Sequence, residues 1–210
     1  MTERKKNQIT ALCAVLLALT LTVLSAADYF AAAGRVRNDV LRLHILANSD
    51  SDADQAVKLL VRDRLLTETA DLFRAAGSPA EAAAALEPLL PALAETAAAV
   101  LREHGMEYGA AAALSREYFN TRAYGDVTLP AGSYLALRVI LGEGQGHNWW
   151  CVMFPPLCIP AVTEPQAEAV FSPDGLRVVS PAPRFQVRFR LVEIYEEIME
   201  QIRERKDREK

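Results

Sequence analysis

The chain has 210 residues, of which 51% are hydrophobic and 24% charged, and its formal net charge is −4. This length and composition predict one folded domain with a proper core and exclude a disordered or collagen-like chain. The acidic balance argues against a nucleic-acid-binding protein, and three cysteines without zinc-finger spacing exclude a disulfide-dense miniprotein.

The first 27 residues have the organisation of an export segment. Three basic residues at 4–6 precede an uncharged stretch over residues 7–27, whose apolar run covers residues 9–24. Residues 25–27 (Ser-Ala-Ala) are suited to signal peptidase, so we expect this chain to use the general secretion machinery. The apolar run is short for a membrane span, which needs about 20 residues, and this favours a cleaved signal over a retained anchor.

Either outcome places residues 28–210 outside a membrane. Residues 1–27 carry one acid and three bases, so the exported part has a net charge of −6. It retains Cys151 and Cys158, and an even cysteine count in an exported domain permits a disulfide. That bond would close only a short local loop.

The first half of the exported part predicts one strand and then helices. The strand covers residues 36–47, and the polar cluster at 48–52 forms a turn in which Ser51 is an N-cap. The helix that follows has apolar residues at helical spacing and ends at Gly77.

A second helical region starts with Ser78 as its N-cap and ends at Gly105. Pro88 and Pro91 must interrupt it, which predicts a short helix followed by a longer one.

The second half is predicted to be mostly extended. Strands are expected over residues 106–115, 116–123, 134–141 and 147–154. Gly142, Gly144 and Gly146 fit a hairpin loop between the last two strands better than a phosphate-binding loop, because their spacing matches neither nucleotide-binding motif.

The remainder is predicted to be a surface connection over residues 160–184 and an amphipathic strand–helix tail over 185–207. Together the patterns predict an α+β fold. It is a single domain with a small, mostly antiparallel sheet packed by several helices, behind an N-terminal signal or anchor helix.

Several polar patterns are candidate sites. Asp50, Asp52 and Asp54 resemble the start of a calcium loop, but the glycine and glutamate that such a loop needs further on are missing. His44, His104 and His147 are scattered, so no metal site or cofactor is predicted.

His147 and Cys151 suggest an alternative function, an extracytoplasmic thiol-dependent hydrolase or transferase. Four residues along a strand separate their Cα atoms by about 13 Å, so direct contact would need a turn. A structural disulfide with Cys158, or two packed thiols, is the simpler interpretation.

Trp149 and Trp150 precede an apolar, proline-containing segment at 153–157. Adjacent residues on a strand face opposite sides, so one tryptophan can join the core while the other needs separate cover. Such a segment is typical of a contact patch, although the tail or the alanine-rich helices could equally cover it.

Two long strings carry a resemblance to a known family. The first is Leu41–Ser51 (LRLHILANSDS) with Asp54, Gln55, Lys58 and 61–63, and the second comprises 124–125, 129–132, 136–138, 142–144 and 147–158 (HNWWCVMFPPLC). Over about residues 36–160, the chain resembles the stage II sporulation protein R family.

The resemblance implies a signalling protein of endospore-forming bacteria. Such a protein is made in the forespore and exported across its membrane into the intermembrane space, secreted or N-terminally anchored. There it activates a mother-cell membrane aspartic protease, which processes the sigma-E precursor. The resemblance brings no catalytic residues and no cofactor, so a non-enzymatic ligand is expected.

Two surfaces are candidates for contact with that protease. The first contains Trp149, Trp150, Phe154, Pro155 and Pro156, with Cys151 and Cys158 shaping the loop. The second contains His44, Asn48 and Asp50 at and after the first predicted strand.

Overall fold

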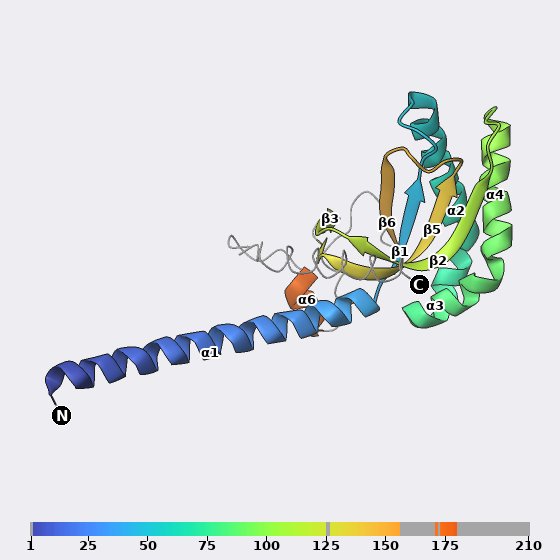
Figure 1. Cartoon of the computed structure of the whole chain (residues 1–210). Helices are drawn as coiled ribbons and strands as arrows, with labels where there is room; N and C mark the ends of the chain where they lie inside the picture. The colour runs from blue at the N-terminus through green and yellow to red at the C-terminus, as the bar shows by residue number, and fades with distance from the viewer. Residues whose placement is uncertain (1, 125–126, 156–170, 172, 180–210) are drawn as a thin grey trace, which may run out of the picture.

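The structure is a computed structural model that describes residues 2–124, 127–155, 171 and 173–179 (Figure 1). Its elements in chain order are α1 (Glu3–Asn38), β1 (Leu41–Leu46), α2 (Asp52–Ala75), α3 (Pro79–Leu86), the 3-10 turn η1 (Glu87–Leu89), α4 (Leu90–Glu103), β2 (Ala110–Phe119), β3 (Arg122–Tyr124), β4 (Val127–Leu129), β5 (Gly132–Leu141), β6 (Asn148–Phe154) and α6 (Pro173–Val179). The predicted α+β fold is confirmed.

The main sheet has four strands in the order β2-β5-β1-β6, and β3 pairs with β4 in a small second sheet. β1 runs parallel to β5 and antiparallel to β6, while β2 is antiparallel to β5. Antiparallel pairing therefore predominates, as predicted, and β1 is a central strand with partners on both sides.

Three local predictions are corrected. Residues 142–146 do not form a hairpin loop, because β1 lies between β5 and β6 and the loop must pass over its end. The first strand begins at Leu41, since residues 36–38 complete α1. β2 runs across the expected boundary at 115/116, and residues 122–123 of the second expected strand belong to β3.

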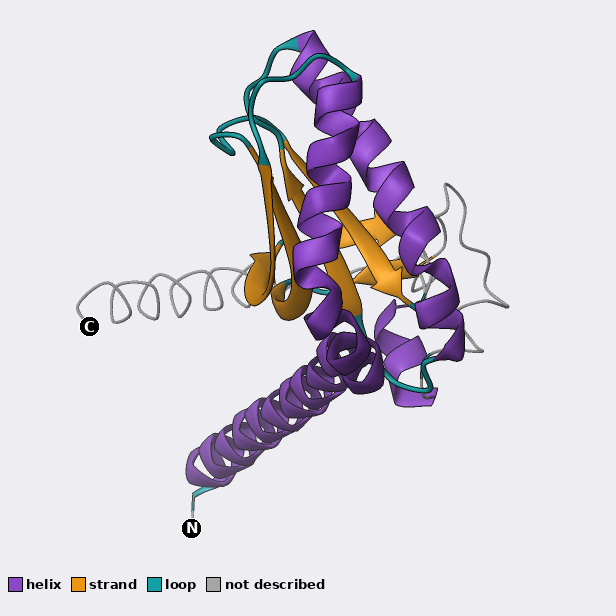
Figure 2. Ribbon diagram, turned by 90° about the vertical axis from the view of Figure 1, so that its right-hand side faces the viewer, coloured by secondary structure: helices purple, strands orange, loops and turns teal. Residues whose placement is uncertain are grey.

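Helices α2, α3 and α4 cover one face of the sheet, as Figure 2 shows. The side chains of Ser51 and Ser78 accept hydrogen bonds from the backbone of Asp54 and Glu81, each at 3.2 Å, which confirms both N-caps. The prolines separate a short α3 from a longer α4, as predicted. The core between helices and sheet includes Leu41, Leu43, Ile45, Val57, Val61, Leu65, Leu101, Leu137, Val139 and Met153.

The opposite face of the sheet has its own smaller core, made with β4, α6 and the end of α1. Arg42 of β1 is fully buried there. Its guanidinium lies 3.8 Å from the ring centre of Phe119 and 5.0 Å from that of Tyr134, and it donates to the Tyr124 hydroxyl. Burial lowers the pKa of Arg42, and the aromatic faces replace part of the solvation that the cation has lost.

The long helix α1 changes its environment along its length. Its N-terminal part is exposed, whereas Ala33 and Val36 are buried and Val36 belongs to the second core. Arg37 donates to the carbonyl oxygen of Ala131 at 3.1 Å, next to β5. The last turns of α1 are therefore part of the folded domain.

Two helical stretches of the described chain are long and apolar enough to cross a membrane, α1 and Pro79–Glu103. The second comprises α3, η1 and α4, and its Leu86, Leu93 and Leu101 are buried against the sheet and α2. It serves as a core element of the domain.

Part of the predicted surface connection is ordered as α6, whose Val179 is fully buried. The rest of 160–184, apart from Phe171, lies outside the described residues, as does the tail at 185–207.

The docking of α1 predicts a specific sensitivity to charge. Val36→Asp places an unpaired carboxylate in the second core and should lower the free energy of unfolding by about 3 kcal/mol or more. Ala31→Asp adds the same group on the exposed side of the helix and should cost less than about 1 kcal/mol. Urea unfolding of the full chain in a mild detergent measures both, and equal losses would contradict the docking.

Candidate functional site

The turn after β1 and the loop before β6 meet at one end of the sheet. The amides of Gly146 and Gln145 donate to the carbonyl oxygens of Ala47 and Asn48 at 2.9 and 3.2 Å. The Asn48 side chain also accepts from the amide of Glu143 at 3.0 Å. The two sequence stretches that resemble the sporulation family are thus hydrogen-bonded to each other at this end of the sheet.

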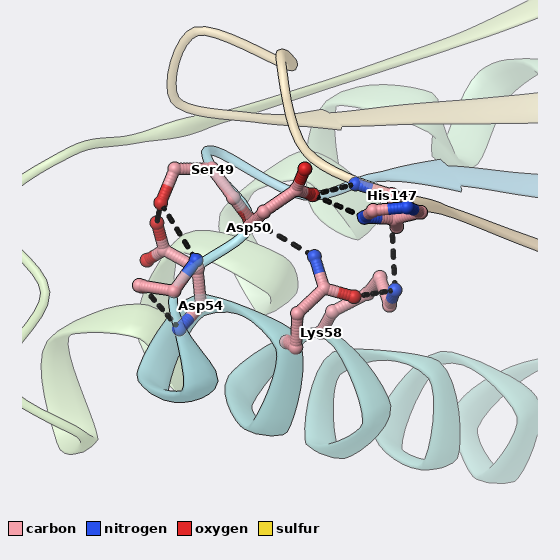
Figure 3. Close-up of polar contacts among 7 residues, drawn as sticks. Ser49, Asp50, Asp54, Lys58 and His147 are labelled. Carbon is pink, nitrogen blue, oxygen red and sulfur yellow. Dashed lines mark hydrogen bonds and ion pairs between the residues drawn. The ribbon is translucent and has the colours of Figure 1, made fainter.

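We call Asn48, Ser49, Asp50, Asp54, Lys58 and His147 the tip cluster, most of which is labelled in Figure 3. Its members come from the turn after β1, the first two turns of α2 and the loop before β6. They lie at the end of the domain opposite to the point where α1 leaves it (Figure 1).

Asp54 is the buried centre of the tip cluster. Its carboxylate accepts from Asn48 Nδ2 at 2.9 Å, from Ser49 Oγ at 2.5 Å and from the Tyr108 hydroxyl. Burial alone would raise the pKa of Asp54, but these hydrogen bonds outweigh it and hold the pKa below its ordinary value. Burial, together with the hydrogen bond to Asp54, raises the pKa of Tyr108.

Lys58 is buried one turn further along α2. Its ammonium donates to Gln55 Oε1 at 2.5 Å and to the carbonyl oxygen of His147 at 2.8 Å. Burial lowers the pKa of Lys58, and the nearby Asp50 partly opposes that shift. Lys58 therefore ties α2 to the start of β6.

The exposed part of the tip cluster is the pair of Asp50 and His147. Asp50 Oδ1 accepts from the backbone amide of His147 at 2.6 Å and lies 2.5 Å from its Nδ1. These contacts lower the pKa of Asp50, the backbone hydrogen bond most strongly. The side chains are 56% and 79% exposed, so this pair is available to a partner.

The glycines of residues 142–146 permit close approach to the turn. Gly142 has a φ of +56°, and a Cβ there would lie 2.2 Å from Asn48 Oδ1. A Cβ on Gly146 would lie 2.1 Å from the backbone oxygen of Ser49. The glycines are therefore required by contact with the β1 turn and not by a hairpin.

The two tryptophans face opposite sides of β6. Trp149 packs on the helical side, with the Arg62 guanidinium 4.4 Å from its ring centre. Trp150 stacks on His44 on the other side, with ring centres 3.7 Å apart and planes 15° apart.

The other candidates of these two surfaces are largely covered. His44 is 4% exposed, and its Nδ1 lies 3.5 Å from Glu117 Oε2. Phe154 is half-buried, Pro155 is buried, and Pro156 lies outside the described residues. Among the predicted contact residues of the described chain, Asp50 is the most exposed.

The structure does not bring His147 and Cys151 together. His147 is held by Asp50 at the tip, whereas Cys151 is buried in the core under the helices, further along the extended β6. Cys158 lies outside the described residues, so its disulfide with Cys151 stays a prediction. In the described part of the chain, no group of three His, Cys, Asp or Glu side chains could hold a metal ion.

Sequence reasoning missed Lys58 and Tyr108 as members of this site. Asp54 and Lys58 stand four residues apart among the apolar positions of α2, and buried charges on a core face are the signal that could have revealed them. Tyr108 comes from the segment before β2, and its distance in sequence left no comparable signal.

Comparison with known proteins places most of these elements in one family. The family model described as Stage II sporulation protein R matches residues 37–164. Stage II sporulation protein R of Bacillus subtilis (strain 168) is 37% identical over 123 residues, which are 59% of this chain and 55% of that protein. The chain thus spans a little over half the length of this relative, and no solved structure matches.

The buried carboxylate predicts a pH-dependent stability. The pKa of Asp54 is lower in the folded than in the unfolded chain. The ionised carboxylate therefore adds to the free energy of unfolding above the ordinary carboxyl pKa near 4, and this stabilisation is lost as the pH falls through the pKa of the folded state. Asp54→Asn should cost about 1–3 kcal/mol at pH 7 and flatten the loss of stability in acid. Urea unfolding between pH 7 and 3 tests this. Asp52→Asn, exposed in the same turn, should cost less than about 1 kcal/mol.

The close approach of the loop predicts that Gly146→Ala disrupts the tip. The new methyl group would meet the backbone oxygen of Ser49, which cannot move without breaking the turn, so we expect a loss of about 2 kcal/mol or more. A Cβ on Gly109 meets nothing within 4 Å, which makes Gly109→Ala the matched control. Hydrogen exchange of the 142–147 amides reports the disruption, and unchanged protection in Gly146→Ala would contradict the packing.

Proposed function

The chain belongs to the stage II sporulation protein R family, and we propose that it is an exported sporulation signal. Its role is to activate a membrane-embedded aspartic protease of the mother cell, which then processes the sigma-E precursor. The signal acts as a ligand in the intermembrane space and not as an enzyme. The observation that carries this proposal is the family match over residues 37–164, which includes the complete four-stranded sheet and helices α2–α4.

The N-terminal helix supports the export step. α1 contains an apolar stretch preceded by basic residues, which suits targeting to the secretion machinery.

The charges of the tip cluster support a ligand better than a catalyst. Asp54 and Lys58 are buried, and their hydrogen bonds to the turn and the loop fix these segments in place. They are therefore not presented to a substrate.

The tip is the surface that best suits contact with the protease. Asp50, Glu143 and His147 are exposed, and backbone hydrogen bonds from the 142–147 loop to the β1 turn fix their positions. A preorganised surface loses little conformational entropy on binding. The exposed carboxylates of Asp50 and Glu143 favour a basic patch on the partner.

Co-production tests the function. The full chain, the membrane protease and the sigma-E precursor are made in a bacterium that does not sporulate, and the precursor is followed by immunoblot. Conversion should occur only when all three proteins are present. Failure with a folded, exported chain would contradict the proposal.

The same assay tests the tip. Among the described residues, Glu143 is held through its backbone amide and not through its carboxylate, so Glu143→Lys reverses a surface charge without removing that hydrogen bond. We expect precursor conversion to fall about tenfold, which corresponds to about 1.4 kcal/mol of binding. Glu87→Lys reverses an exposed charge in η1 and should leave conversion unchanged. Normal conversion by a folded Glu143→Lys chain would contradict contact through the tip and would favour the other predicted surface, which contains Trp149 and Trp150.

A further inference from the structure

The apolar side chains between Ile9 and Leu24 of α1 are not covered by the described part of the chain. Nine large ones are 51% to 66% exposed: Ile9, Leu12, Val15, Leu16, Leu17, Leu19, Leu21, Val23 and Leu24. They lie on all sides of the helix, as its nearly uniform exposure over these residues requires. A helix that is apolar all round needs a hydrocarbon environment, and a single protein partner would cover only one side of it.

The helix is also long enough for a bilayer. The uncharged stretch over residues 7–27 is helical throughout, so it extends for about 31 Å and matches a hydrocarbon core of about 30 Å. The apolar run at 9–24 alone suggested a shorter segment. Because Asn7, Gln8 and the residues after Leu24 continue the same helix, the whole uncharged stretch is available to span.

The predicted cleavage site lies inside this helix. Ser25-Ala26-Ala27 lies within Glu3–Asn38, more than ten residues from its end, and no glycine or proline precedes Gly34. A peptidase has to take the residues next to the scissile bond in an extended form. Cleavage after Ala27 would therefore require that a continuous helix, with no built-in breaker, be unwound.

The far end of the same helix is fixed in the domain. Ala32, Ala33 and Val36 are buried, and α1 contacts both α6 and β5. Leu24 and Ala32 are only eight positions apart, about 12 Å along the helix. The apolar stretch and the domain are thus joined by little more than two turns.

From these observations we propose that α1 is retained as a transmembrane anchor that is continuous with the domain core. The lipid bilayer surrounds its apolar surface. Tyr29 and Phe30 follow the uncharged stretch, at the level where aromatic side chains favour the membrane interface. The anchor holds the domain within about two helical turns of the membrane, with the tip cluster at the opposite end (Figure 1).

Production of the full chain in a bacterium, with an epitope tag at its C-terminus, tests retention. The membrane fraction is washed with alkaline carbonate, extracted with detergent, and the intact mass is measured. We expect almost all of the chain in the washed membranes, with the mass of an uncleaved protein. A soluble exported chain that begins at Asp28 would overturn the proposal.

The bond after Ala27 could stay uncut because the helix shields it or because the sequence around it is a poor peptidase substrate. A helix-breaking substitution distinguishes these two reasons. Thr22→Pro removes a backbone hydrogen bond six positions before the scissile bond and leaves the docked residues unchanged. We expect this variant to lose residues 1–27 and most of its membrane-bound fraction. Thr22→Ala keeps the helix and should behave as wild type. If Thr22→Pro also stays uncleaved, continuity of the helix is not what preserves the anchor, and the proposal fails.

Discussion

The central position of β1 is the constraint on which the rest of the domain depends. The backbone of β1 pairs with β5 on one side and with β6 on the other. Because β5 and β6 are consecutive in the chain, the connection between them has to pass over the end of β1. The turn after β1 and the loop before β6 are therefore forced together, and the tip cluster is the chemical consequence of that topology.

Close passage of two backbones determines the residues at the tip. Gly146 leaves room for the carbonyl of Ser49, and the amides of the loop are satisfied by carbonyls and the Asn48 side chain at the end of β1. Asp54 and Lys58 then fix the turn to α2 from the buried side. Burying these charges is unfavourable unless they are hydrogen-bonded, which explains why each has several partners. The result is a rigid end of the domain whose exposed groups need little ordering on binding.

Local signals predicted the helices better than the sheet. Ser51, Ser78 and the prolines at 88 and 91 act within a few residues, so caps and breaks were predictable from neighbouring positions. Strand order depends on contacts between residues about a hundred positions apart, and nothing near residues 142–146 indicated that β1 would lie between β5 and β6. The same limit applies to the site. Asp50 was a candidate from its own turn, but its pairing with His147 follows only from the topology.

The two ends of the domain have different physical roles. At one end, the second core receives the last turns of α1, so the apolar helix and the domain cannot rotate freely against each other. At the other end, the tip presents charge that is fixed by buried hydrogen bonds. Arg42 of β1, buried among the rings of Phe119, Tyr124 and Tyr134, links the main sheet to β3 within the second core. A bilayer around α1 would thus set the direction in which the tip faces, because no flexible linker intervenes between Glu3 and Asn38.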